Sequence, residues 1–264
     1  MMLLNYLLVF LLPFLVTAIP HSIPDDSNNT DTDTDTDTDI DTKTNANDIL
    51  TTTSIFSSTI SNLKNLHLTS CSLNTTTLNM NHNLTTLPTP ASNLTLQHVA
   101  LGRGTQNYTC PSPQNSTSKP TSVGALATLF DVSCIASADE ELLHHLPALM
   151  QGVPLETLDF FATLISLAGT GAGILGEHYF TGSGQPSFDL RFSGDDDWAT
   201  MKKVASANAP KSVDVPWLKL NGIDGVGIKE VYRVYTAGGV SPATCAGHEG
   251  AFEVEYAAEY WFYG

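Results

Sequence analysis

The chain has 264 residues and a formal net charge of −16, with 27 acidic and 11 basic side chains. This balance excludes nucleic-acid binding by phosphate neutralisation, which requires clustered Lys and Arg. The length is sufficient for one or two domains.

The chain begins with an apolar run, MMLLNYLLVFLLPFLVTA, that ends on small residues. This order is typical of a secretory signal peptide over residues 1–18, with cleavage near Ala18. A membrane anchor is the alternative, but the run is short for a bilayer span, which needs roughly 20 residues. We therefore expect a protein that is secreted, extracellular or held in the cell wall, with no transmembrane segment after cleavage.

Residues 19–64 differ in composition, with the low-complexity sequence DTDTDTDTDIDTKTNAND near their centre. A segment this acidic and this poor in apolar residues cannot bury enough surface to offset its ordering entropy. We expect a disordered, solvated tail, and no calcium site, because a flexible repeat fixes no coordination geometry. Residues 65–264 are then predicted to form a single β-rich domain.

Six N-x-S/T sequons lie in the N-terminal half of the chain, and each requires a secretory route and an exposed loop to be used. Together with the signal peptide they predict a glycoprotein. The candidate sites are Asn28, Asn74, Asn83, Asn93, Asn107 and Asn115.

The four cysteines are Cys71, Cys110, Cys134 and Cys245. An even set in an oxidising compartment predicts two disulfides, and the sequence leaves three pairings open. We favour Cys110 with Cys134, which closes a local loop, and Cys71 with Cys245. The alternative is that one pair stays reduced and buried. No metal site is expected, because the chain has no C-x-x-C motif.

Two early segments predict strands. LTLQHVAL, residues 94–101, alternates side chains with period two and runs into GRGTQNYTC. VGALATLFDVSC is the second, ending near Cys134.

A helical insertion is predicted at about residues 137–168. Ser137 and Glu140 have capping-box spacing at its start. Pro147 should stop or kink the first helix, and Pro154 can open a second one.

The remaining segments are strands separated by Gly and Pro turns, and Gly238 and Gly239 suit a hairpin turn. AFEVEYAAEYWFYG shows period two most clearly, and we expect the face that carries Glu253, Glu255 and Glu259 to be half-solvated. These patterns predict a mainly β fold, an antiparallel sandwich or barrel with a short helical insertion.

Residues 169–179, GTGAGILGEHY, contain the spacing G-x-G-x-x-G at Gly171, Gly173 and Gly176. A dinucleotide site requires a strand before these glycines and a helix after them. Here a helical pattern precedes and an aromatic, turn-rich segment follows, so we predict a junction and no cofactor.

Several segments occur in an order that resembles a known family. They include LTLQHVALGRGTQNYTC, GEHYFTGSGQPSFDL, VPWLKLNG, IKEVYRVYTAGGVSPATC and FEVEYAAEYWFYG. The chain resembles, over residues 71–264, the fungal branch of domain-of-unknown-function family 3455. The resemblance implies a secreted fungal protein, and fungal members often carry the name malate dehydrogenase. The family's strongest motifs match His178, Tyr179, Pro216, Trp217, Arg233, Thr236, Gly238, Gly239, Pro242 and Cys245, with no catalytic roles assigned.

Malate dehydrogenase chemistry requires a nucleotide fold, an arginine cluster for the dicarboxylate and a His–Asp pair. The chain has only Arg103, Arg191 and Arg233, widely spaced, and lacks a valid nucleotide loop. We therefore expect neither a nicotinamide cofactor nor this activity.

Two functions rank above malate dehydrogenase, which stays as a third hypothesis. The first is a non-enzymatic module of the cell surface or wall that binds carbohydrate or another extracellular protein, with His178, Trp217, Arg233 and Trp261 as ligand candidates. Trp198, Trp217 and Trp261 could form stacking surfaces, and full burial of Trp261 would remove it from such a surface. The alternative is a secreted hydrolase. Its candidate acids and bases are His178, Asp189, Asp195, Asp197, His248 and Glu249.

Overall fold

Eight antiparallel strands, neighbours in chain order, close into one barrel in which β1 also pairs with β8. The computed structural model describes residues 71–80, 87–111, 116–167 and 173–264, all within the unit Ile49–Gly264. The predicted mainly β fold is confirmed. The strands are β1 (Leu96–Cys110), β2 (Thr121–Asp131), β3 (Ile174–Phe180), β4 (Pro186–Asp189), β5 (Trp198–Ala207), β6 (Trp217–Val226), β7 (Glu230–Gly238) and β8 (Gly250–Tyr263).

Several predictions fall outside the described residues. They concern the signal peptide, the acidic tail, Gly169 and Gly171, and the sequons at Asn28, Asn83 and Asn115.

Strand alternation sorts the apolar side chains into two cores. The inner core lies within the barrel and contains Leu129, Phe188, Val231 and Tyr260. The outer core lies on the other face of the same strands and contains Val99, Tyr232, Val234 and Trp261. Residues that are adjacent in β7 and β8 therefore serve opposite faces of the sheet.

Glycines appear where the closed sheet leaves no room for a side chain. A Cβ on Gly102 would collide with the ring of Tyr260, and one on Gly176 would collide with the backbone of Asp189 on the neighbouring strand. Gly176 thus belongs to β3, which begins three residues before the expected start at Glu177, and a helix precedes the glycines. This order is the reverse of a dinucleotide site.

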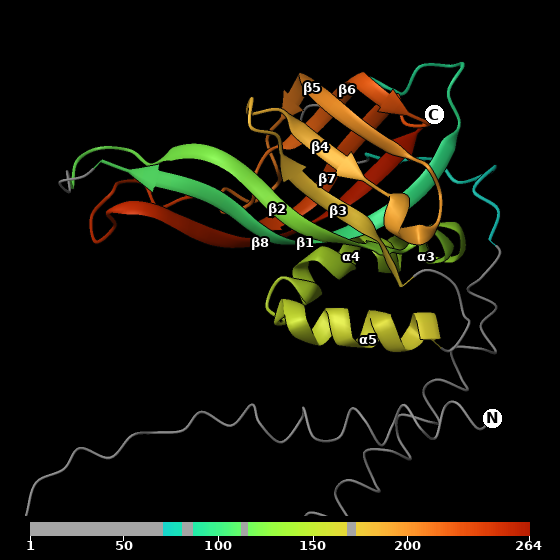
Figure 1. The fold of residues 1–264 in the computed structure, drawn as a ribbon, viewed down its shortest axis with the longest axis horizontal. Coiled ribbons are helices and arrows are strands. Elements are labelled where there is room, and N and C mark those ends of the chain that lie inside the picture. Colours follow the sequence, from blue (N-terminus) through green and yellow to red (C-terminus); the bar gives the residue numbers. More distant parts are fainter. Residues whose placement is uncertain (1–70, 81–86, 112–115, 168–172) are drawn as a thin grey trace, which may run out of the picture. The chain divides into compact units, whose positions relative to one another are not determined.

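Strands β1, β2 and β8 run on beyond the barrel as a long ribbon (Figure 1). The connection from β7 to β8 returns along it, and Cys245 in this connection forms a disulfide with Cys110 at the end of β1. The Cys245 amide also donates to the carbonyl of Ser118, at 2.8 Å. Gly238 and Gly239 have φ angles of 71° and 87°, but they open this longer loop, so the expected tight hairpin is wrong.

Three helices form the predicted insertion: α3 (Ser133–Ala138), α4 (Glu140–Met150) and α5 (Leu155–Leu167). Helix α4 packs against β1, β7 and β8, while α5 contacts β3 (Figure 1). The insertion begins before residue 137, because the second strand ends at Asp131 and Cys134 lies in a helix.

The caps of these helices differ in part from those expected. Asp139, not Ser137, caps α4, because its side chain accepts from the Leu142 amide at 3.0 Å. Pro147 lies inside α4, which continues to Met150. Helix α5 begins directly after Pro154, whose carbonyl accepts from the amide of Leu158 at 3.3 Å.

These helices bury the second face of β8, which was expected to be half-solvated. Every residue from Tyr256 to Tyr263 is buried, and Glu259 is 0% exposed. The prediction holds only for the ribbon end of the strand, where Glu253 and Glu255 are exposed.

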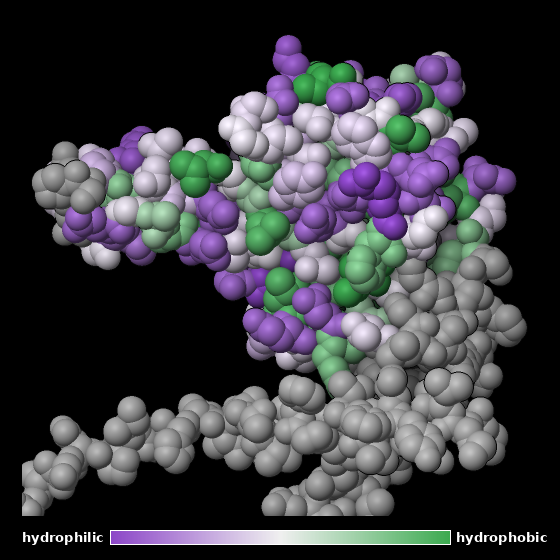
Figure 2. All heavy atoms as spheres, viewed as in Figure 1, coloured by the Kyte–Doolittle hydropathy of each residue, from purple (hydrophilic) through white to green (hydrophobic). Residues whose placement is uncertain are grey.

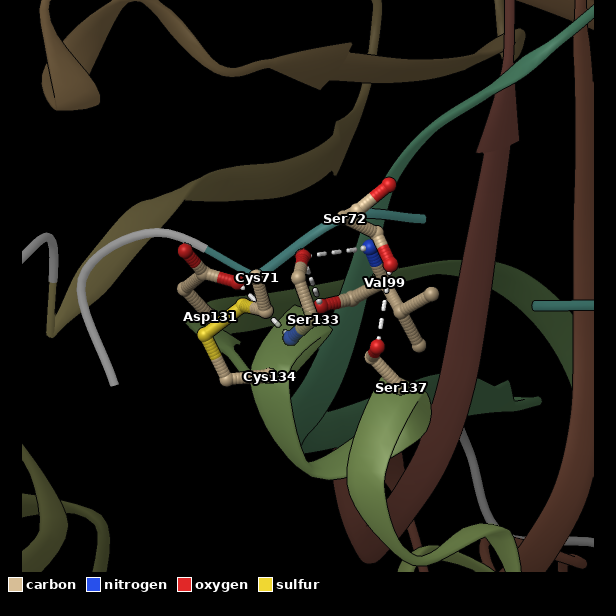
Figure 3. The surroundings of a disulfide bond; sticks show 7 residues. All are labelled: Cys71, Ser72, Val99, Asp131, Ser133, Cys134 and Ser137. Atoms are coloured by element: carbon tan, nitrogen blue, oxygen red, sulfur yellow. Dashed lines mark hydrogen bonds between the residues drawn. A yellow bond between two sulfur atoms is a disulfide. The ribbon is translucent and has the colours of Figure 1, made fainter. Parts of the chain in front are cut away.

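The second disulfide joins Cys71 to Cys134 and fastens the segment 71–80 to α3 (Figure 3). Ser137 donates to the carbonyl of Ser72 at 2.9 Å, and Ser133 accepts from the amide of Val99 at 3.0 Å. The four cysteines thus form two disulfides, but the favoured pairing is wrong. It assumed that Cys110 and Cys134 close a local loop, whereas Cys134 lies in α3 and Cys110 ends β1 beside the loop that carries Cys245.

On the face shown in Figure 2, apolar side chains are scattered among polar ones instead of forming one patch. Across the described part of the chain, no helix has the length and hydropathy needed to span a bilayer.

Candidate functional site

Arg233 lies inside the barrel, on the same face of β7 as the inner-core residue Val231. In the sheet register it stands between Leu218 of β6 and Tyr260 of β8, which both pack in the inner core. The strand pattern therefore places a guanidinium among apolar side chains.

The positive charge of Arg233 is buried without a counter-ion. Only 8% of the residue is exposed. Its Nη2 donates to the Pro216 carbonyl at 2.9 Å, while its buried Nε has no hydrogen-bond partner. Among the described residues, no carboxylate lies within 4.0 Å of it. Buried charges are normally paired because desolvation is costly, so an uncompensated one marks a candidate site for an anion.

Two tyrosines of β8 face the same interior. The hydroxyls of Tyr256 and Tyr260 share a hydrogen bond of 2.9 Å, and both residues are 0% exposed. Burial raises the pKa of each phenol, and the Arg233 charge opposes this rise. Both therefore remain neutral hydrogen-bonding groups at physiological pH.

His178 of β3 completes this group. Its ring stacks on Phe188, with centroids 4.4 Å apart, and lies 5.7 Å from the ring of Tyr260. Burial lowers the pKa of His178 to about 4; a hydrogen bond to Ser187 opposes this, and the Arg233 charge adds to it. Nδ1 donates to the Ser187 carbonyl at 2.8 Å, so the neutral ring has its lone pair on Nε2.

We refer to Arg233, Tyr256, Tyr260 and His178 as the Arg233 cluster. The sequence had singled out His178 and Arg233, and the structure brings them together. It had missed the two tyrosines as site residues, although the period-two pattern had placed Tyr256 and Tyr260 on one face of the last strand.

The loop between β7 and β8 is fastened beside this cluster. The Tyr108 hydroxyl donates to the Gly239 carbonyl at 2.7 Å, and its ring stacks on Phe252 with centroids 5.7 Å apart. A Cβ on Gly239 would lie 2.9 Å from side-chain atoms of Gln106 and Tyr256. The loop backbone thus comes close to the inner-core side chains of β1 and β8.

The two tryptophan candidates lie elsewhere, in the outer core. Trp217 is 3% exposed and Trp261 is 0% exposed. Trp261 Nε1 donates to Glu259 at 2.9 Å. Full burial removes Trp261 from any stacking surface, so the expected aromatic groove cannot be built on it.

The candidate acids and bases of a hydrolase are dispersed. Asp189 binds Arg191, Asp195 accepts from Ser193, and Asp197 lies 3.3 Å from His98. His248 stacks on Phe252, with centroids 4.4 Å apart. Over the described part of the chain, no group of three His, Cys, Asp or Glu side chains could hold a metal ion.

One groove does gather carboxylates, between α5 and the outer side of β3 and β4. It has a volume of about 430 Å³, and its polar lining includes Asp159, Glu177, Asp189 and Arg191. Burial raises the pKa of Asp159, and the neighbouring Glu156 charge adds to this. The hydrogen bond from Arg191 lowers the pKa of Asp189. His178 lies on the opposite face of β3 and does not reach this groove.

Comparison with known proteins identifies the family of the chain. The family described as "Protein of unknown function (DUF3455)" matches residues 90–264. The chain belongs to this family. No curated protein and no solved structure matches it significantly. The family match contains the whole barrel and the Arg233 cluster, whereas the segment 71–80 lies outside it.

Proposed function

We propose that this member of the DUF3455 family is a secreted, glycosylated binding module whose ligand site is the Arg233 cluster. The observation that carries the proposal is the buried guanidinium, which has no carboxylate partner and an unsatisfied Nε. A negatively charged ligand would provide both the counter-charge for Arg233 and a hydrogen-bond acceptor for its Nε. The ligand would be a small molecule of the extracellular space or a charged group on wall carbohydrate or another protein.

The same groups favour binding over catalysis. A general acid or base works best with a pKa near the working pH. The pKa of His178 is about 4, and burial raises the pKa values of Tyr256 and Tyr260. The cluster therefore offers hydrogen bonds and one positive charge, with no proton-exchanging group poised at neutral pH.

The test is thermal shift of the protein secreted from the full-length chain, against small anions and their neutral analogues. We expect a saturable rise in Tm with anions only, because a ligand that binds the folded state alone stabilises it. Arg233→Met should abolish the rise. Lys202→Met is the control, since Lys202 is an exposed cation of β5 that belongs to neither candidate site. Equal shifts in wild type and Arg233→Met would contradict the proposal.

Secretion and glycosylation are supported by the two disulfides and by the placement of the sequons. Asn74 and Asn93 are exposed, whereas Asn107 is half-buried within β1 and pairs with Gly124 and Glu253. After expression in a secreting eukaryotic host, peptide mass spectrometry should find glycans at Asn74 and Asn93 and none at Asn107. Retention of the protein inside the cell, with no glycan, would contradict this part.

The groove between α5 and β3 favours a second candidate function, hydrolysis by acidic residues. It combines Asp159, whose pKa is raised, with Asp189, whose pKa is lowered, and such a divergence is typical of an acid and base pair. Release of sugar from wall polysaccharides should then be lost in Asp159→Asn and in Asp189→Asn. No release by the wild-type protein would eliminate this candidate.

A further inference from the structure

We infer that the Arg233 cluster selects a compact ligand with a single carboxylate and an apolar body. This inference rests on the binding function proposed above and specifies the chemical class of the ligand. It follows from three properties of the barrel interior: its charge, its hydrogen-bonding groups and the side chains around them.

The inner cluster carries one positive charge, so a ligand with one negative charge would neutralise it. Arg233 is cationic at all physiological pH values. The other titratable groups of the inner cluster, His178, Tyr256 and Tyr260, are neutral near pH 7, and so is Tyr108 of the adjoining strand, whose pKa burial raises. A monoanion therefore neutralises the site. A dianion would bring a second, unpaired charge into a buried position, which is costly.

The donors of the cluster suit a carboxylate. A guanidinium is a planar fork that binds the two oxygens of a carboxylate side by side. In Arg233 the Nη2 is held by the Pro216 carbonyl, and the buried Nε has no acceptor. In the Tyr256–Tyr260 pair one hydroxyl donates to the other, at 2.9 Å, so the proton of the second remains for a ligand.

The neighbouring side chains suit an apolar body. Phe188 lies 5.5 Å from the ring of Tyr260, edge to face, and Leu218 is the partner of Arg233 in the sheet. Phe180, 36% exposed, lies 5.6 Å from His178. An aromatic or aliphatic ligand body would pack against these groups.

Several interior positions beside His178 and Phe188 carry small side chains. Across the register, Gly104 pairs with Ala127, Ala127 with His178, His178 with Phe188, and Phe188 with Ala199. Ala258 of the inner core lies between Tyr256 and Tyr260 on β8. An eight-stranded barrel has room for side chains or for one small ligand, so a ligand here must be compact.

The experiment uses the protein secreted from the full-length chain and four probes: benzoate, its neutral isostere benzamide, the dianion phthalate and inorganic sulfate. Each is titrated at constant ionic strength in a thermal-shift assay at pH 7. We expect benzoate to raise Tm saturably, benzamide to have no effect, and phthalate and sulfate to bind at least tenfold more weakly than benzoate.

Two variants locate the binding. Arg233→Lys keeps the charge but loses the planar fork, and it should weaken benzoate binding at least tenfold, while Lys202→Met, at an exposed position of β5, should bind as wild type does. The comparison among the four probes uses wild-type protein only, so it stands even if an Arg233 variant fails to fold.

The outcomes separate this inference from the proposed function. Binding of phthalate or sulfate as tight as that of benzoate, and sensitive to Arg233, would overturn the ligand class and leave the binding function intact. Equal binding of benzamide and benzoate would overturn the role of the charge. No shift with any of the anions would overturn both.

Discussion

The two faces of strands β7 and β8 treat buried charge in opposite ways. On the outer face, Glu259 is 0% exposed and is paired with His144 of α4 at 2.8 Å. On the inner face, one residue along β8, Tyr260 adjoins Arg233, which has no carboxylate partner among the described residues. Removing one partner of a buried pair is strongly destabilising, whereas replacing an unpaired buried charge by an apolar group need not be.

On the outer face, both His144 and Glu259 have several hydrogen-bonding or stacking partners. His144 stacks on Tyr235, with centroids 3.5 Å apart, and its Nε2 lies 3.4 Å from Glu140. Glu259 also accepts from Trp261 Nε1 at 2.9 Å. These contacts hold α4 against β7 and β8 and close the outer core.

The largest effect is expected from breaking the outer pair. His144→Ala leaves the buried Glu259 without its partner on α4, and this should lower the free energy of unfolding by about 4 kcal/mol. Urea denaturation measures it. The double variant with Glu259→Gln, which keeps an acceptor for Trp261, should recover part of the loss. A loss below about 1 kcal/mol in the single variant would show that the pair does not hold α4.

The next effect concerns pH and the inner face. The pKa of His178 is lowered from 6.5 to about 4, so between these values the unfolded chain binds a proton that the folded barrel does not. This group's contribution to stability is thus present above pH 6.5 and is lost as pH falls through about 4, a change of about 3 kcal/mol.

His178→Asn, which retains a donor toward Ser187, should remove this part of the pH dependence. The measurement is urea denaturation of both proteins at several pH values from 4 to 7. Parallel stability profiles would contradict a buried, neutral His178.

Removing the inner charge should cost little in the absence of ligand. Arg233→Met replaces an uncompensated buried cation by an apolar side chain of similar length, and the free energy of unfolding should change by less than about 1 kcal/mol or increase. This is the reverse of His144→Ala. A loss of about 3 kcal/mol would mean that Arg233 is a structural partner in the fold.

The smallest effect separates the two disulfides. Cys71 and Cys134 are half-buried, whereas Cys110 is 5% and Cys245 is 0% exposed. Under graded reductant, alkylation followed by mass spectrometry should label Cys71 and Cys134 first while the barrel stays folded. Simultaneous labelling of all four cysteines would show that the Cys71–Cys134 disulfide is no more accessible to reductant than the Cys110–Cys245 disulfide.

Local patterns were sufficient to predict the strands and the insertion. Period two in the last strand places Tyr256 and Tyr260 on one face, and the helical pattern before the glycines and the strand after them are found as α5 and β3. These features depend on neighbours in sequence, which a pattern records directly.

The features that failed depend on contacts distant in sequence. Glu259 is buried because α4, more than 100 residues earlier, covers it. Cys110 meets Cys245 across 135 residues because a loop folds back along the ribbon. The absence of a carboxylate beside Arg233 also depends on residues distant in sequence, because the strand pattern around one arginine does not show which side chains face it.

The central claim is that Arg233 binds an anion inside the barrel, and one comparison tests it most directly. The benzoate-induced rise in Tm should be saturable in the wild-type protein and absent in Arg233→Met, with the ligand-free Tm values nearly equal. A rise of the same size in both proteins would show that the anion binds elsewhere and would contradict the account.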